Sequence, residues 1–352
     1  MDKIILYGAN GYTGKLIARM AREHQIEPIL AGRREEAIRP MAEEMGMEWA
    51  VADLDDDKAL DALLAKAPMV LHAAGPFKHT ARPMIKACIR NGKHYTDITG
   101  EIGVYEMAKV YDEQAKAKNI VVMPGVGFDV VPTDCMALQL RNRMPDAVSL
   151  KLAFAGLGSG LSHGTATTMA EGMGQKSAAR INGKISPVPL GHKGMTVDFG
   201  VKKLFVMSIP WGDVSTAYTT TGIPNIETYT AQSPKTFRML KYQWAFNWLL
   251  RTSFMKNRQL KKIKSRPAGP TDEQRSKSIS LVWGEATNAK GEKIEGRLKC
   301  AEGYTLTAIS SLIIARKILD GNFRPGYQTP AGCYGENLIL EVPGSEFIEL
   351  NA

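Results

Sequence analysis

The residues at positions 4–7 are apolar and lead directly into a turn containing three glycines, Gly8, Gly11 and Gly14, which is followed by a helix-length segment. A buried strand, a glycine-rich turn and a helix in this order are typical of the start of a dinucleotide-binding βαβ unit. The first glycine permits the tight turn, the second lets the backbone approach a pyrophosphate, and the third lets the helix pack on the strand. The helix then presents its first N–H groups to the phosphates. Because the spacing is G-x-x-G-x-x-G rather than the commoner G-x-G-x-x-G, the segments that follow have to support the assignment.

The second predicted strand, at 26–30, begins after a helix-length stretch and is followed by Arg33 and Arg34. NAD sites usually place Asp or Glu here for the ribose 2′-hydroxyl, whereas Arg accommodates the 2′-phosphate of NADP. We therefore expect NADP(H) as the cofactor. The alternative is that both arginines are solvated residues at the start of the next helix. The expected cofactor-binding residues in this part are Gly8, Asn10, Gly11, Tyr12, Thr13, Gly14, Arg33 and Arg34.

Strand and helix patterns continue to alternate, with strands at 47–52 and 69–73 and helices at 56–66 and 80–90, which predicts a parallel, doubly wound sheet. Asp53 follows the third strand, where it would either contact the adenine or cap the next helix. The small residues after the fourth strand leave room for the cofactor, so we expect contacts from Ala74, Gly75, Pro76 and Phe77. His72, inside that strand, is expected to be a core residue.

The length of 352 residues favours two domains. We predict an α/β fold with an NADP-binding Rossmann domain at 1–146, a substrate and dimerisation domain with a mixed sheet at 147–320, and a segment at 321–352 that returns to the nucleotide domain. The four cysteines are isolated and lack zinc spacing, so we expect reduced thiols and no metal. No secretory signal and no apolar stretch of about 18 residues is present, which predicts a cytoplasmic protein.

Within the second domain, the predicted strands are at 149–153, 214–221 and 225–230, with a helix at 165–175. A hairpin is expected from 278–283 and 296–301, and a final helix from 304–319. Residues 234–264 have an apolar pattern with helical spacing and predict one long helix, in which Trp244, Phe246 and Trp248 belong to the apolar arc.

The formal net charge of +9 is concentrated in one place, because residues 256–266 carry six positive and no negative charges. No nucleic-acid motif accompanies this cluster, so we expect no nucleic-acid partner. The long basic helix would cover the core, contact a dimer partner, or lie on a membrane surface or acyl-chain entrance. We expect a homodimer and keep peripheral membrane contact through 234–266 as an alternative.

Two longer motifs carry a family resemblance: residues 94–101, HYTDITGE, and residues 123–134, MPGVGFDVVPTD. Together with the opening glycine turn, the Gly-Pro-Phe step at 75–77 and residues 303–308, they resemble the saccharopine dehydrogenase family, in particular its saccharopine dehydrogenase-like oxidoreductase branch. The resemblance implies an NADP- or NAD-binding Rossmann domain, a second α/β domain and hydride transfer. It extends to saccharopine reductases, which reduce an imine, and to enoyl reductases.

The second domain is short, and residues 150–230 contain a single arginine, Arg180. Because recognition of several carboxylates usually needs arginines, this composition favours a less charged small or lipid-like substrate than saccharopine. The expected activity is reduction of a C=N, C=O or C=C bond. The alternatives are a saccharopine-type imine reductase and an NADP(H)-binding redox sensor without turnover.

We expect the catalytic groups on the loop that leaves the fifth strand, where Tyr95, Asp97 and Glu101 would donate or orient a proton. The alternative is that Asp97 caps a turn and Glu101 pairs with a cation. Phe128, Asp129 and His163 are the expected substrate contacts. A Y-x-x-x-K pair at 105–109 is interpreted as coincidental, with both side chains on a helix surface.

Overall fold

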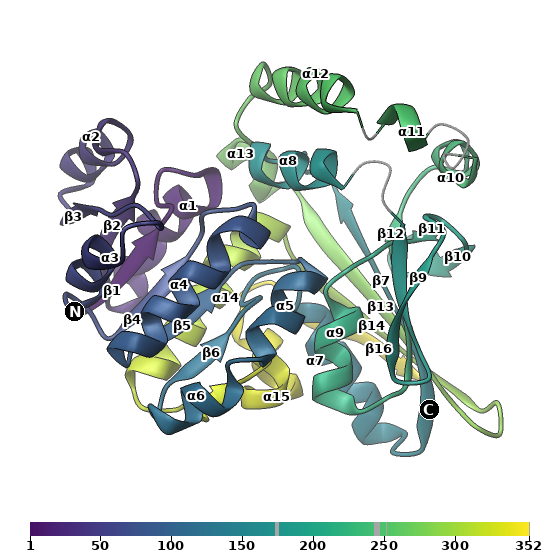
Figure 1. Ribbon diagram of the computed structural model, residues 1–352. Coiled ribbons are helices and arrows are strands. Elements are labelled where there is room, and N and C mark those ends of the chain that lie inside the picture. The colour runs from purple at the N-terminus through teal and green to yellow at the C-terminus, as the bar shows by residue number, and fades with distance from the viewer. Residues whose placement is uncertain (173–175, 243–246, 251, 352) are drawn as a thin grey trace. The chain divides into compact units, whose positions relative to one another are not determined.

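The computed structural model describes residues 1–172, 176–242, 247–250 and 252–351 (Figure 1). The chain divides into two compact units. The first consists of Met1–Val131 and Tyr304–Cys333, and the second of Pro132–Gly303 and Tyr334–Ala352. The long helix near the end of the chain, 304–319, therefore groups with the first unit, and the last strand, 346–351, groups with the second.

The first unit is built on a sheet of seven parallel strands. Their order across the sheet is β15 (Gly326–Tyr327), β6 (Val121–Met123), β5 (His94–Asp97), β4 (Met69–His72), β1 (Asp2–Tyr7), β2 (Ile26–Gly32) and β3 (Trp49–Val51). This order, with the reversal next to β1, confirms the predicted doubly wound fold. Ile4, Ile5 and Leu6 have no exposed surface, as expected for a strand covered on both faces.

The helices of this unit alternate with its strands along the chain (Figure 1). They are α1 (Tyr12–Met20), the 3-10 helix η1 (Ala21–His24), α2 (Glu35–Met45), α3 (Asp57–Leu64), α4 (Phe77–Asn91), α5 (Ile102–Lys109), α6 (Asp112–Ala117), α14 (Gly303–Leu319) and α15 (Pro330–Tyr334). The predicted final helix, 304–319, corresponds to α14.

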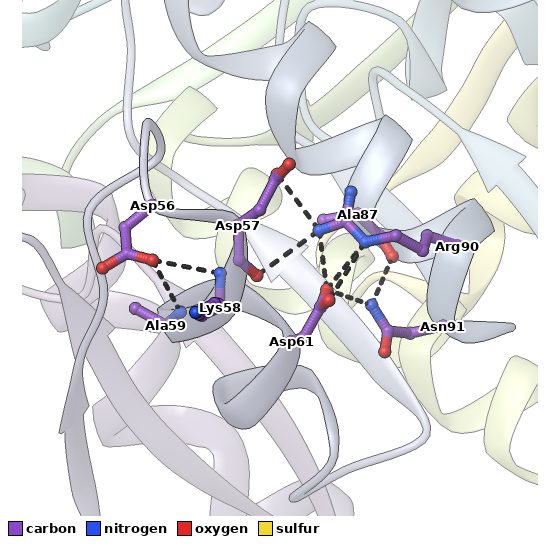
Figure 2. A network of polar contacts seen from close by, with 8 residues as sticks. All are labelled: Asp56, Asp57, Lys58, Ala59, Asp61, Ala87, Arg90 and Asn91. Carbon is purple, nitrogen blue, oxygen red and sulfur yellow. Dashed lines mark hydrogen bonds and ion pairs between the residues drawn. The ribbon is translucent and has the colours of Figure 1, made fainter.

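Helix α3 is fixed by polar contacts at its start and along one side (Figure 2). The Asp56 carboxylate accepts hydrogen bonds from the amides of Lys58 and Ala59, both 3.0 Å long, and so caps the helix. The Arg90 guanidinium of α4 donates to Asp61 at 2.6 Å and pairs with Asp57 at 3.1 Å. These contacts attach α3 to α4.

The second unit contains a nine-stranded mixed sheet, also as predicted. The order along its main path is β10 (Gly194–Asp198), β11 (Lys203–Ser208), β12 (Asn225–Ala231), β7 (Ala147–Leu157), β13 (Ile279–Asn288), β14 (Lys293–Ala301) and β16 (Glu346–Asn351), while β8 (Ser177–Ile181) and β9 (Lys184–Val188) form a hairpin beside β12. Strands β12 and β7 are parallel. The predicted hairpin is confirmed as β13 and β14.

Among the described residues, the second unit contains the helices α7 (Val131–Arg143), α8 (His163–Glu171), α9 (Asp213–Thr221), α10 (Pro234–Lys241), α11 (Asn247–Leu250), α12 (Ser253–Lys264), α13 (Asp272–Ser276) and the 3-10 helix η3 (Glu336–Glu341). Residue 175, the predicted end of the helix that corresponds to α8, lies outside the described residues.

The strand predicted at 214–221 is wrong, because these residues form α9. The run of Val, Ser and Thr has strand propensity, but most of these side chains are buried and Gly222, with φ of +72°, ends the helix in the left-handed conformation. Tertiary packing decides the conformation here.

The single long helix predicted at 234–264 is also wrong. The Ser233 side chain caps α10 through the amide of Thr236, and the Thr252 side chain caps α12 through the amide of Met255, so each marks a separate helix start. The predicted apolar residues Trp244 and Phe246 lie outside the described residues.

Candidate cofactor-binding and active site

The glycine turn between β1 and α1 is a backbone cradle that side chains would fill. Gly8 has φ of +86°, and a Cβ there would lie 2.6 Å from the amide nitrogen of Ala74. At Gly14 a Cβ would lie 2.5 Å from the Gly8 carbonyl oxygen, so α1 can pack on the turn only without a side chain. Asn10 and Gly11 are exposed, and Tyr12 and Thr13 are partly exposed. The turn thus presents backbone and the start of α1 to a ligand, as dinucleotide phosphates require.

The carboxyl end of β2 places Arg33 and Arg34 at the surface, where both are exposed. Arg34 lies 3.8 Å from Glu36. The charges of Arg33 and Asp53 both act on the Tyr7 hydroxyl, which donates to the Ala52 carbonyl at 2.8 Å. Burial, and after it the negative charge of Asp53, raises the pKa of Tyr7 to about 12, while Arg33 opposes this rise. Arg33 and Asp53 therefore lie at the same edge of the sheet.

Asp53 does not cap α3, which was one of its two expected roles. Its carboxylate accepts a hydrogen bond from the Asp55 amide at 3.1 Å, and Asp56 provides the helix cap instead. The side chain remains exposed at the end of β3, a position compatible with the other role, contact with an adenosine group.

The loop after β4 joins the glycine turn to α4. Ala74 contributes its amide beside Gly8, and its carbonyl accepts from the Thr80 hydroxyl at 2.6 Å. At the first turn of α4, the Glu101 carboxylate accepts from the amides of Phe77, at 2.7 Å, and Lys78, at 3.1 Å. A carboxylate that accepts hydrogen bonds from the first N–H groups of a helix is stabilising, because it satisfies these donors and places a negative charge at the positive end of the helix dipole. Glu101 thus fixes the start of α4 from the loop after β5.

Asp97 is a buried carboxylate that fixes the loops after β5 and β6. It accepts from the amides of Thr99 and Gly125, both 2.9 Å away, and from the Tyr95 hydroxyl at 2.7 Å. Burial raises the pKa of Asp97 to about 6, and the hydrogen bonds limit this rise. The proposed turn-capping role of Asp97 is present. Neither Tyr95 nor Asp97 has exposed surface.

His72, in β4, lies beside the Tyr95 ring and has no exposed surface. Burial lowers the pKa of His72 to about 3, so the ring is neutral near pH 7. The predicted core position is confirmed.

The loop after β6 is held against α14, a contact that sequence patterns did not reveal. The Phe128 amide donates to the Thr307 hydroxyl at 3.0 Å, and the Ser310 hydroxyl donates to the Val126 carbonyl at 2.7 Å. A Cβ at Gly127 would lie 2.6 Å from the Thr307 methyl group. Thr307 and Ser310 therefore position this loop, and Thr307 belongs to the segment 303–308 that contributed to the family resemblance.

Asp129 is the partly exposed carboxyl group of this loop. It lies against the backbone of Gly100, whose added Cβ would collide with the carboxylate. Burial, and after it the charge of Glu101, raises the pKa of Asp129 to about 7. Asp129 is thus a carboxyl group that can hold a proton near neutral pH, with Phe128 beside it in sequence.

The remaining candidates have structural contacts. His163, in the second unit, donates from Nε2 to the Arg266 carbonyl, 2.7 Å away, and begins α8. The prediction that Tyr105 lies on a helix surface is wrong, because its side chain is fully buried and donates to the Thr99 carbonyl. Lys109 pairs with Glu106 at 2.7 Å. The Y-x-x-x-K residues thus have separate contacts.

Among the described residues, no group of three or more His, Cys, Asp or Glu side chains could hold a metal ion. In the same part of the chain, no helix combines the length and apolar character needed to cross a membrane.

Comparison with known proteins agrees with this geometry. Residues 4–123 match the family of the saccharopine dehydrogenase NADP binding domain. This stretch includes the glycine turn, Arg33, the β5 residues Tyr95 and Asp97, and Glu101 in the loop after β5. The match confirms the NADP-binding domain and NADP(H) as its cofactor.

Two kinds of relatives are similar over part of the chain. The saccharopine dehydrogenase-like oxidoreductase of Homo sapiens is 27% identical over 215 residues, 53% of this chain and 50% of that protein. The trans-acting enoyl reductase of Mycobacterium leprae (strain TN) is 34% identical over 149 residues, 40% of this chain and 36% of that protein. The chain thus spans about half the length, or less, of these curated relatives.

The fold has a counterpart among solved structures. Apo histidine-tagged saccharopine dehydrogenase (L-Glu forming) from Saccharomyces cerevisiae matches with a TM-score of 0.68 and 12% identity, covering 99% of this chain and 100% of that one. The similarity confirms the α/β fold. Together with the sequence matches, it confirms the resemblance to the saccharopine dehydrogenase family.

Proposed function

We propose that the chain is an NADPH-dependent reductase of a C=N, C=O or C=C bond, on the premise that residues 4–123 match the saccharopine dehydrogenase NADP binding domain. The observation that carries the proposal is the glycine cradle, in which Gly8 and Gly14 leave no room for a Cβ. The proposal adds a proton-donating carboxyl group on the same unit and a preference for a substrate with few carboxylates.

The residues present fit the cofactor. The exposed turn at 10–13 would hold the pyrophosphate, and the loop at 74–77 would border the nicotinamide half. Arg33, exposed at the end of β2, would pair with the 2′-phosphate by charge-assisted hydrogen bonds. Arg34 has Glu36 nearby and would contribute less. When bound, NADPH supplies the hydride.

The proton comes from Asp129 in this proposal. A carboxyl group with a pKa of about 7 is protonated in a useful fraction of molecules near neutral pH. Asp129 is also partly exposed, whereas Tyr95 and Asp97 are buried. We therefore assign proton donation to Asp129, while Tyr95, Asp97 and Glu101 position the loops around it.

Arg180 supports a less charged substrate. Its guanidinium donates to the carbonyls of Val214, at 2.7 Å, and Gly183, at 2.6 Å, and it stacks on the Tyr218 ring at 4.0 Å. The side chain is only 5% exposed. The single arginine of residues 150–230 thus has a structural role, which weighs against a saccharopine-type substrate bound by this stretch.

The test follows NADPH oxidation by the full chain with a panel of imines, enoyl thioesters and ketones. We expect turnover of one class and a loss of about 100-fold or more in kcat/KM in Asp129→Asn, with NADPH affinity unchanged. Asp146→Asn, a change of the same kind in the second unit, serves as the control. Tight NADPH binding without turnover of any class would refute the reductase and favour the redox sensor.

A further inference from the structure

We propose that exposed side chains on and beside α10, α11 and α12, within residues 228–271, here called the basic segment, form a docking surface for an anionic membrane. The segment lies between Glu227 and Asp272 and contains no acidic residue. It contains ten basic residues: Lys235, Arg238, Lys241, Arg251, Lys256, Arg258, Lys261, Lys262, Lys264 and Arg266. Such a concentration of one charge attracts an anionic surface, to which each nearby Lys or Arg adds affinity.

Large apolar side chains of the basic segment are exposed to solvent. Met239 of α10 is 67% exposed, and Tyr242, the residue after the end of α10, is 62% exposed. Trp248 of α11 and Phe254 at the start of α12 are both 72% exposed. Tyr and Trp have an apolar body and a polar end, which suits them to the boundary between headgroups and acyl chains. Exposed aromatic side chains beside basic ones are the combination that an interfacial helix uses.

The basic side chains of α12 are available for such contact. Arg258, Lys261 and Lys262 are exposed, and within the described parts of the chain none of them has an ion-pair partner. Ile263 is buried, and α12 lies next to α8 (Figure 1). The helix therefore has one packed side and one basic side. By contrast, Arg90 in the first unit is neutralised by Asp57 and Asp61.

Covering the core or contacting a dimer partner would account for the basic segment less well than a membrane does. The exposure of Trp248 and Phe254 is inconsistent with a helix that only covers the core. A symmetric dimer through this surface would bring two copies of the same positive segment together, which like-charge repulsion opposes. An anionic lipid surface satisfies both the charge and the exposed apolar side chains.

The proposal does not depend on the reductase activity, so its test uses vesicle flotation of the full chain. The probes are phosphatidylcholine vesicles with and without about one third phosphatidylserine, at low and high salt. We expect binding to the anionic vesicles, little binding to pure phosphatidylcholine, and release by salt. Lys261→Glu/Lys262→Glu should lower the vesicle partition coefficient by at least about 30-fold, and Trp248→Ser/Phe254→Ser by at least about tenfold.

Matched controls separate a surface site from general charge. Lys58→Glu/Lys86→Glu changes net charge equally on exposed positions of the first unit, and Val110→Ser removes an apolar side chain that is 74% exposed. Both controls should float as the unaltered protein does. NADPH affinity, measured on every variant, reports whether the first unit is folded.

Three results would overturn the proposal. One is the absence of flotation with anionic vesicles, and another is an equal loss in the control variants. The third is that the protein does not bind vesicles but binds a single-stranded RNA or self-associates, and that Lys261→Glu/Lys262→Glu or Trp248→Ser/Phe254→Ser abolishes this binding.

Discussion

Replacing Glu101 by Gln tests whether this carboxylate fixes the start of α4. The glutamate accepts two backbone hydrogen bonds, of 2.7 and 3.1 Å, from the amides of Phe77 and Lys78. Gln keeps the length of the side chain but provides one carbonyl acceptor, and its NH₂ group then faces the other amide. The negative charge at the positive end of the helix dipole is lost as well.

The expected cost is about 2 kcal/mol in the free energy of unfolding. Loss of the interaction between charge and helix dipole contributes about 0.3–1 kcal/mol. Loss of one charge-assisted hydrogen bond contributes about 1.5–3 kcal/mol before the side chain relaxes. For a domain of about 150–250 residues, 2 kcal/mol corresponds to a decrease of roughly 4–8 °C in Tm.

Thermal and urea unfolding, measured with and without NADPH, provide the assay, because ligand-dependent transitions identify the first unit. The control is Glu106→Gln, which removes a glutamate on α5 whose partner is the surface residue Lys109. That change should cost no more than about 0.5 kcal/mol. If Glu101→Gln and Glu106→Gln have the same stability, the carboxylate does not hold α4 and the reasoning is refuted.

Two further predictions concern the proton donor and the cradle. The pKa of Asp129 is raised to about 7 in the folded protein, so its stabilising contribution is present at low pH and decreases as pH rises from about 4 to 7. Asp129→Asn should flatten the curve of stability against pH between about pH 4 and 7. Glu101→Gln removes a negative charge near Asp129 and should lower the pH at which this decrease in stability ends. Unchanged curves would contradict the raised pKa of Asp129. Gly14→Ala, whose Cβ meets the Gly8 carbonyl, should abolish detectable NADPH binding in calorimetry. Gly103→Ala, where nothing lies within 4 Å of the new Cβ, should retain it, and equal binding by both variants would count against the cradle.

The sheet of the first unit was predictable because its signals are local. Strands β1, β2 and β4 are short, mostly apolar runs, a helix follows each of them, and Gly8 and Gly14 occupy positions where a side chain would collide with backbone. The order of the strands then follows from the rules for parallel sheets.

The errors arise where distant contacts override local preference. Residues 214–221 have strand-forming side chains but form a buried helix, and Arg180 bonds to a carbonyl of that helix. Tyr105 belongs to a surface-like pattern, yet its ring is buried and its hydroxyl contacts the Thr99 carbonyl. Burial of this kind depends on segments that periodicity does not connect.

The candidate site shows the same division. The sequence motifs predicted Glu101 and Asp129 as site residues, but the positions of these two side chains depend on partners elsewhere in the first unit. Glu101 reaches an amide 24 residues away, and the loop of Asp129 is held by Thr307, 179 residues from its partner Phe128. The sequence predicted that carboxylates contribute to the candidate site. It did not predict their long-range contacts, because these depend on how the chain folds.

The most direct test of the central claim is the affinity of the full chain for NADPH and for NADH, measured by isothermal titration calorimetry with Arg33→Ala alongside. A charge-assisted contact from Arg33 to the 2′-phosphate, at about 1.5–3 kcal/mol, predicts that NADPH binds roughly 10- to 150-fold more tightly and that the variant loses most of this preference. Equal affinity for the two dinucleotides, or a preference that survives Arg33→Ala and Arg34→Ala together, would contradict it.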